Sequence, residues 1–306
     1  MNKVLKTYEI FENLPFQSFY KDSVLLNDQT QIGELDLIFR INIPLRKFDF
    51  IDDFYTCNLS CYGLNNSSQV VIRFECDNMP AVDIKILKLK RDLELYDLND
   101  FILLSKFFFY SVLVSNQQFT FEEECHLVSE LVNIWESRNV FEYAHSSRVA
   151  FYSKRFAEAI GMSPSDQNEI YWAAFAHDLG KIFVPKKILN KSGELSQEER
   201  EQLKNHTYWI DCIFDAFDNF NALLPSIKHH HERWDGYGYP DHLSKEEIPL
   251  YSRIINIADS YDAMINFRVY KNALSSSQAT KEIEKGAGNQ FDPDLAKEFI
   301  KFQRRL

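Results

Sequence analysis

His177 and Asp178 stand side by side at the end of an apolar helical run, residues 170–181. Folding would take both side chains out of water, and burying an unpaired charge costs several kcal/mol. Each of them therefore needs a partner. A single buried histidine or aspartate usually has an ordinary hydrogen bond. The pair alone is a weak sign of a metal site, so the rest of the chain would have to supply further ligands.

The chain is long enough for two domains. It has 306 residues, of which 45% are hydrophobic, and this is typical of proteins that bury a core. The formal net charge of -11 opposes binding to long nucleic acids, because much of the affinity for DNA comes from neutralising its phosphates. A small anionic ligand can still be bound by cations gathered at one site.

The N-terminal residues lack the apolar segment and the small-residue cleavage site of a signal peptide. The longest apolar run, residues 101–114, contains Lys106 and is shorter than the roughly 20 residues that a membrane-spanning helix needs. The five cysteines form no CxxC pair, which predicts reduced thiols. We therefore expect a cytoplasmic protein without a membrane span.

Residues 1–118 are expected to form an α+β domain. Two segments, 37–44 and 69–76, are rich in β-branched and aromatic residues, and turn-forming residues lie between them. Residues 97–114 have the pattern of a largely buried helix, and the polar residues 115–118 mark the boundary. The segment has no group of metal ligands and no phosphate-binding loop. It is either a regulatory or partner-docking domain or a scaffold that covers the second half.

Residues 119–306 are expected to form an all-α helical bundle. Thr120 and Glu123 have the spacing of a capping box, and the pattern is helical from there on. Gly161 ends one helix, and residues 163–164, Ser-Pro, begin the next one, which leads to the His-Asp pair.

Two further histidines lie on apolar faces of this bundle. The helix expected between residues 142 and 160 carries His145 on the face that it shares with Val149 and Phe156. A capping box at residues 196–199 opens a helix that we expect to extend to residue 217, with His206 on its inner face. Both imidazoles therefore point inward.

Three consecutive histidines, His229, His230 and His231, fall in residues 225–236, which we expect to form one short helix. Neighbouring residues on a helix point about 100° apart, so two adjacent imidazoles would serve two different ions rather than chelate one. Asp259 lies in another mostly apolar helical segment, where a buried carboxylate needs a partner. These features suggest a centre with two metal ions.

The number of inward-pointing side chains decides between a metal site and ordinary hydrogen bonds. Of the eight histidines, only His126 and His242 lie away from the pattern, and five of the others share inward faces with two aspartates. Separate hydrogen bonds for all of these groups within one helical domain would be a rare coincidence. Nitrogen and oxygen ligands without cysteine suit Fe, Mn, Zn or Co.

With these residues in hand, the segment from about 120 to 306 resembles the HD-GYP family, a branch of the metal-dependent HD-domain phosphohydrolases. The resemblance rests on HSSRV at 145–149, HDLGK at 177–181, HHERWDGYGYP at 230–240, ADSYDA at 258–263, RVY at 268–270 and GNQFDP at 288–293. It implies hydrolysis of cyclic di-GMP, a bacterial second messenger, to linear pGpG, GMP or both.

The resemblance also implies two divalent metal ions bridged by Asp178, with iron or manganese as the metals typical of the family. The implied metal ligands are His145, His177, Asp178, His206, His230, His231 and Asp259. Family members with a third metal have a glutamate four residues before the first histidine, where this chain has Phe141. We therefore expect a binuclear centre, with His229 as an extra surface histidine. Such a pair of ions makes a separate general base unnecessary.

The implied substrate contacts are Lys181, Tyr239, Asp262, Arg268 and Lys271. Lys181 would act with Asp178 in catalysis by reaching a phosphate oxygen; the less favoured alternative is a solvated lysine near a helix end. Arg268 and Lys271 would hold the second phosphate, or they form an exposed basic pair. Tyr239 would contact a guanine, or it packs within its loop. Asp262 either orients a ligand histidine or contacts the substrate.

Two other classes of function remain open. The chain could be an inactive receptor for a cyclic dinucleotide, or a docking module whose Gly-Tyr-Pro loop recruits signalling proteins such as diguanylate cyclases. It could also be a di-iron oxygenase, as some HD-domain relatives are. The Gly-Tyr-Pro loop and the cations expected to face phosphate favour the phosphodiesterase.

Overall fold

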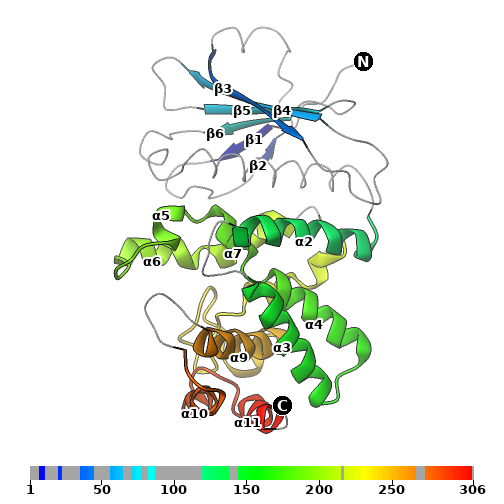
Figure 1. Ribbon diagram of the computed structural model, residues 1–306, viewed down its shortest axis with the longest axis vertical. Helices are drawn as coiled ribbons and strands as arrows, with labels where there is room; N and C mark the ends of the chain where they lie inside the picture. The colour runs from blue at the N-terminus through cyan, green and yellow to red at the C-terminus, as the bar shows by residue number, and fades with distance from the viewer. Residues whose placement is uncertain are drawn as a thin grey trace. The chain divides into compact units, whose positions relative to one another are not determined.

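The computed structural model describes six strands between residues 7 and 86 and, further along the chain, residues 119–137, 144–214, 217–266 and 273–304. The chain divides into two compact units, Met1–Leu113 and Val114–Leu306. Figure 1 shows the strands in the first unit and the described helices in the second. The functional ranges expected from the sequence, 1–118 and 119–306, stay predictions.

The first unit contains a sheet in the order β2-β1-β6-β5-β4-β3. Its strands are β1 (Thr7–Ile10), β2 (Tyr20–Asp22), β3 (Leu35–Pro44), β4 (Thr56–Leu64), β5 (Val70–Cys76) and β6 (Val82–Ile86). Neighbouring strands are antiparallel except β1 and β6, which are parallel. The two segments predicted as strands fall in β3 and β5, where branched and aromatic side chains favour extended backbone. The predicted helix 97–114 lies outside the described residues, so the α+β assignment stays a prediction.

The described residues of the second unit form helices joined by loops and include no strand, as predicted for this half of the chain. The helices are α2 (Phe121–Ser137), α3 (His145–Ala159), α4 (Pro164–Ala176), α5 (Lys186–Leu189), α6 (Gln197–Lys204), α7 (His206–Phe214), α8 (Leu224–Lys228), α9 (Leu250–Ile265), α10 (Ser276–Gly286) and α11 (Pro293–Gln303), with the 3-10 helices η2 (Leu179–Phe183), η3 (Phe220–Ala222) and η4 (Lys245–Glu247). None of the helices in the described part of the chain is long and apolar enough to cross a membrane. The cytoplasmic location stays a prediction.

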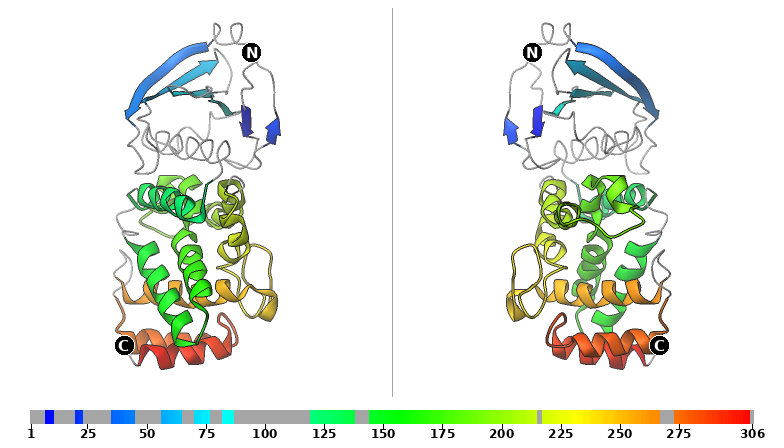
Figure 2. Two further views of the ribbon diagram at one scale, coloured as in Figure 1. Left: turned by 90° about the vertical axis from the view of Figure 1, so that its right-hand side faces the viewer. Right: turned by 90° about the vertical axis from the view of Figure 1, so that its left-hand side faces the viewer.

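Helix α3 packs against α4 and α9, and α10 and α11 cover α9 from the other side (Figures 1 and 2). The core between these helices contains Phe156, Ile170, Ile254 and Phe299, which have no exposed surface. This packing fixes the directions of α3, α4 and α9. Helix α3 begins at His145, α4 ends directly before His177, and Asp259 lies within α9.

Local signals in the sequence set several helix ends as predicted. Thr120, Ser163 and Ser196 each accept a hydrogen bond from the backbone amide three residues later, and the acidic residue at that position bonds back. Gly161 follows α3 with φ 83°, a left-handed conformation that glycine adopts without strain.

The helix predicted to extend from residue 197 to residue 217 is instead divided into α6 and α7 at Asn205, and α7 ends at Phe214. Two backbone carbonyls at the break accept hydrogen bonds from side chains: Leu203 O from His206, and Lys204 O from Thr207. Such local side-chain bonds compete with the regular helical pattern. His206 remains buried as expected.

Gly180 lies where η2 meets α7. A Cβ atom on this residue would lie 2.0 Å from the backbone carbonyl oxygen of His206. Only a residue without a side chain permits this approach. The contact brings the backbone next to Asp178 against the start of α7, and so brings Asp178 and His206 together.

We expect Gly180→Ala to lower the free energy of unfolding by about 1–3 kcal/mol or more, the usual cost of overpacking, and to lower the melting temperature measured by circular dichroism. Gly193→Ala is the matched control, because nothing lies within 4 Å of its Cβ position and its φ is not positive. The control should be as stable as the wild type or slightly more stable. Equal melting temperatures for the two variants would contradict the close packing at Gly180.

Candidate metal centre

His177 and Asp178 lie at the junction between α4 and η2, and their exposed fractions are 1% and 2%. The apolar residues before them, including Ile170 and Ala174, are buried, so this junction lies in the interior of the protein. The sequence interpretation that folding removes both groups from water is therefore confirmed.

Three histidines from separate segments are oriented in the same way. The Nδ1 atoms of His177, His206 and His230 each lie 2.6 Å from the carbonyl oxygen of the third residue before them. A carbonyl only accepts hydrogen bonds, so Nδ1 carries the proton and Nε2 keeps its lone pair. Each ring thus presents an electron pair at Nε2 in a fixed direction.

These lone pairs have no partner among the described residues. The Nε2 atoms of His177, His206 and His230 and the Oδ1 atom of Asp178 are buried and make no hydrogen bond there. Leaving a buried polar group unsatisfied costs about 1–3 kcal/mol. Four acceptors converging without a donor are therefore a poor arrangement for a protein alone, and they suit a cation.

The separations between these atoms fit shared ions. His206 Nε2 and His230 Nε2 lie 3.6 and 3.9 Å from Asp178 Oδ1, while His145 Nε2 and His177 Nε2 lie 3.7 and 3.4 Å from Oδ2. These distances are long for hydrogen bonds. Two ligands that are each about 2.0–2.2 Å from one ion would be separated by roughly this much.

The side chains form two groups, each with ligand atoms within 4.8 Å of one another: Asp178 with His206, His230 and His231, and Asp178 with His145 and His177. Asp178 belongs to both, and its two oxygens face different groups. The arrangement can hold two ions with Asp178 between them. Asp259 Oδ1 lies 3.2 Å from His145 Nε2, at the edge of the second group.

The first group has protonation states that suit a cation. Burial lowers the pKa of His206 to about 3 and that of His231 to about 4. Burial and the neighbouring His231 together hold the pKa of His230 well below its ordinary value. These imidazoles are neutral near pH 7, and neutral imidazoles are the form that binds metals.

Asp178 attracts positive charge. Burial alone would raise the pKa of its carboxyl, but the Lys181 ammonium and the His177 imidazole outweigh burial and hold that pKa well below its ordinary value. Burial would likewise lower the pKa of His177, and the carboxylate of Asp178 reverses this and raises it. The carboxylate therefore stays ionised in the interior and favours a cation beside it.

The three consecutive histidines do not lie on a helix, which corrects the sequence interpretation. Helix α8 ends at Lys228, and the chain turns directly after it. The angle of about 100° between neighbouring helical residues therefore does not apply to His230 and His231. Their ring centroids lie 4.0 Å apart, and both belong to one ligand group. The two-ion interpretation now rests on Asp178 being shared.

His229 points away from both groups. Its Nδ1 lies 2.8 Å from Pro225 O, and its Nε2 lies 2.9 Å from Asp241 Oδ2. Both ring nitrogens are thus used by bonds outside the cluster, as expected for an extra histidine.

Of the predicted substrate contacts, two lie beside the cluster. Lys181 Nζ is 2.5 Å from Asp178 Oδ2, and 16% of its side chain is exposed, so it lies between the buried carboxylate and solvent. The Tyr239 ring is centred 4.8 Å from that of His231. Arg268 and Lys271 lie outside the described residues.

Asp262 is buried inside the protein. Its Oδ2 lies 2.8 Å from His145 Nδ1, and Arg148 donates to both carboxylate oxygens at 2.7 and 3.0 Å. Of the two roles considered for Asp262, orienting a histidine is the one that this geometry favours. The sequence interpretation missed Arg148, although it lies one helical turn after His145, where the two side chains share a face.

The Gly-Tyr-Pro loop is held close to the cluster. A Cβ atom on Gly238 would lie 2.4 Å from the backbone nitrogen of Arg233, so the loop folds directly onto the segment after His231. Tyr208 donates a hydrogen bond to Pro240 O at 3.0 Å. Tyr237, in the same loop, is 84% exposed.

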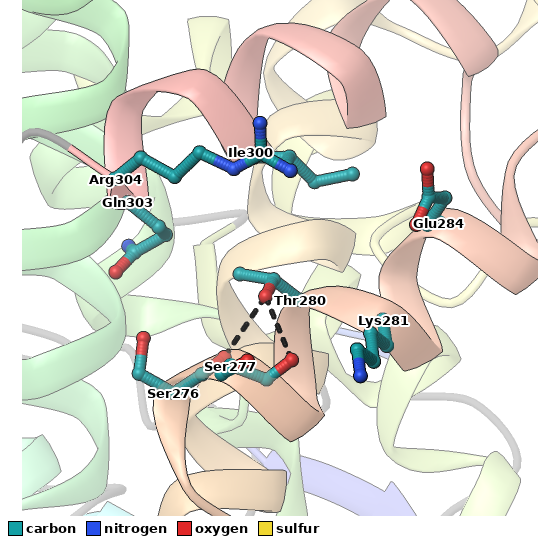
Figure 3. Close-up of a pocket in the computed structure, with 8 residues that line it drawn as sticks. All are labelled: Ser276, Ser277, Thr280, Lys281, Glu284, Ile300, Gln303 and Arg304. Carbon is teal, nitrogen blue, oxygen red and sulfur yellow. Dashed lines mark hydrogen bonds between the residues drawn. The ribbon is translucent and has the colours of Figure 1, made fainter.

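A hollow of about 390 Å³ lies elsewhere, between α10 and α11 (Figure 3). The hydroxyl of Thr280 bonds to backbone carbonyls within α10. The hollow is lined by Ser276, Ser277, Thr280, Lys281, Glu284, Ile300, Gln303 and Arg304. None of the predicted site residues is among them, and the hollow is not part of the candidate centre.

Relatives of this chain are known. A cyclic di-GMP phosphodiesterase of Thermotoga maritima is 38% identical over 192 residues, which cover 61% of this chain and 51% of the relative. A 3'3'-cGAMP-specific phosphodiesterase 2 of Vibrio cholerae is 35% identical over 176 residues, 57% of this chain and 34% of the relative. The cyclic di-GMP phosphodiesterase response regulator RpfG of Xanthomonas campestris is 33% identical over 189 residues, 60% of this chain and 50% of the relative.

The chain thus spans about half or less of the length of these relatives. The family model described as HD domain matches residues 130–295. This range includes both ligand groups, Asp262 with its partner Arg148, and the Gly-Tyr-Pro loop. The chain therefore belongs to the HD domain family, and its motifs resemble those of the HD-GYP branch.

Proposed function

We propose that this chain hydrolyses a phosphodiester bond of cyclic di-GMP, giving linear pGpG, GMP or both, with two divalent metal ions. The observation that carries the proposal is the convergence of buried, unpartnered histidine Nε2 atoms on the two oxygens of Asp178. The names of the relatives support the substrate class.

The two ions would be iron or manganese, both of which accept imidazole and carboxylate ligands. In this proposal His206, His230 and His231 hold one ion, His145, His177 and Asp259 hold the other, and Asp178 bridges them. When bound, such a pair of ions activates water at neutral pH and neutralises charge on a phosphoryl oxygen.

The protein side chains position the substrate. Lys181, between Asp178 and solvent, would contact a non-bridging phosphate oxygen and stabilise the charge that develops there. Tyr239, next to His231, would lie against a guanine, and Arg268 and Lys271 would hold the second phosphate. These cations are needed because a chain with a net charge of -11 otherwise repels an anionic ligand.

A second candidate function is docking of a signalling protein, such as a diguanylate cyclase, through the Gly-Tyr-Pro loop. The observation that favours it is Tyr237, a large aromatic residue of this loop that is 84% exposed. Tyrosine is enriched where proteins bind one another. Tight binding of cyclic di-GMP without hydrolysis would favour this receptor or docking role over the enzyme.

Asp178→Ala is expected to abolish metal binding and hydrolysis together, because it removes the carboxylate shared by both ligand groups. Metal content measured by elemental analysis and turnover of cyclic di-GMP in the presence of Fe²⁺ or Mn²⁺ under reducing conditions test this. Wild-type activity in the variant would show that the bridging assignment is wrong. No turnover by the metal-loaded wild type would argue against the enzyme itself.

His230→Ala should reduce the bound metal, whereas His229→Ala should leave it unchanged. The two residues are neighbours, but only His230 presents an unpartnered Nε2 to Asp178, while both ring nitrogens of His229 are bonded elsewhere. Isothermal titration of each variant with Mn²⁺ measures the difference. Equal losses of affinity would mean that the ligand assignment in this segment fails.

Lys181→Gln is expected to retain both ions and to lower kcat by about 10²–10³, the usual cost of removing one group that stabilises transition-state charge. Elemental analysis and steady-state kinetics on the same preparation separate binding of metal from catalysis. If the variant instead loses metal while the remaining metal-loaded fraction keeps its kcat, Lys181 only stabilises the Asp178 carboxylate.

A further inference from the structure

Helix α3 begins at His145, yet it has no cap of its own. The preceding residue, Ala144, has a left-handed φ of 56° and no side chain that can accept a hydrogen bond. Helices α4, α6 and α10, by contrast, are each preceded by a serine that forms a capping box. The first turn of α3 therefore needs an acceptor from elsewhere in the protein.

Glu136, near the end of α2, supplies that acceptor. Its Oε2 accepts a hydrogen bond from Ala144 N at 2.8 Å, and its Oε1 accepts one from Ser146 N at 2.8 Å. The side chain is buried, with 9% exposed. A carboxylate at a helix N-terminus is also favoured by the helix dipole. The two bonds bracket His145 on both sides and fix its backbone.

The other ligand group is anchored differently. His206 and His230 are oriented by the carbonyls of Leu203 and Ile227, which belong to their own segments. The ring of His145 is held instead by Asp262 of α9, and its backbone is held by Glu136 of α2. Among the hydrogen bonds described, those from Glu136 of α2 to the start of α3 support the His145 group.

We propose that Glu136 is a positioning residue for one of the two ions: it places His145 so that the ion held with His177 and Asp178 is bound, and it does not affect the ion held by His206, His230 and His231. This inference rests on the proposed binuclear centre. It makes occupancy of one metal site depend on the packing of α2, the first described helix of the second unit.

The test is Glu136→Gln, which keeps the size of the side chain but replaces one of the two acceptors with a donor. Glu124→Gln is the matched control, because Glu124 lies on the same helix, is 1% exposed and also accepts backbone hydrogen bonds with its carboxylate, from Asn219 and Phe220. Both variants disturb a buried carboxylate of α2 that accepts backbone hydrogen bonds from another segment, but only Glu136 bonds to residues beside a predicted metal ligand.

Mn²⁺ binding is measured by equilibrium dialysis on chains that elute at the native position in gel filtration, so loss of folded protein does not alter the ions counted per folded chain. The wild type and Glu124→Gln should each bind two ions. Glu136→Gln should bind one ion normally and the second roughly tenfold or more weakly, as when groups that orient a ligand are removed. Electron paramagnetic resonance should then show an isolated Mn²⁺ ion in place of an interacting pair.

Two tightly bound ions in Glu136→Gln would overturn the inference, and so would equal weakening in both variants, since that would reflect a general loosening of α2. Loss of both ions from Glu136→Gln alone would also overturn it, because the effect would not be confined to one group. A wild-type chain that binds no Mn²⁺ would instead overturn the proposed function on which the inference rests.

Discussion

The buried carboxylate of Asp178 is the constraint on which the helical unit depends. One of its oxygens has no hydrogen-bond donor among the described residues, and three imidazole nitrogens around it lack one as well. The neutral imidazoles of His206 and His230 and the ionised carboxylate of Asp178 cannot satisfy one another, so positive charge between them stabilises their convergence. Lys181 supplies part of that charge at the second oxygen, and a pair of divalent cations would supply the rest.

The fold prepares this site through rigid backbone contacts. Three of the ligand histidines bond to a carbonyl one turn earlier, so their ring directions are set by helix ends rather than by flexible side chains. Gly180 lets η2 touch α7 backbone to backbone, which brings Asp178 to His206. Sites built on such elements hold their ligands more precisely than sites on loops.

The two ligand groups differ in what supports them. The rings of His206 and His230 are oriented by carbonyls one turn earlier in the chain, and Asn256 of α9 bonds to the backbone carbonyls of His230 and Glu232. The ring of His145 is held by Asp262 of α9, and its backbone is held by Glu136 of α2. Both groups depend on tertiary contacts, but the hydrogen bonds from α2 reach the backbone only beside His145, so a change in the packing of α2 can act on one ion more than on the other. The ring of Tyr239 lies against His231 of the first group.

The sequence by itself determined the helical class of residues 119–306, several helix ends and the identity of the side chains that gather in the interior. These follow from local rules: capping boxes, glycine at helix ends and the helical spacing of apolar residues. Tertiary structure decided the rest. The break at Asn205, the turn that lets His230 and His231 converge and the support of His145 by Glu136 and Asp262 all depend on contacts between distant segments, and a periodic pattern along one helix carries no information about them.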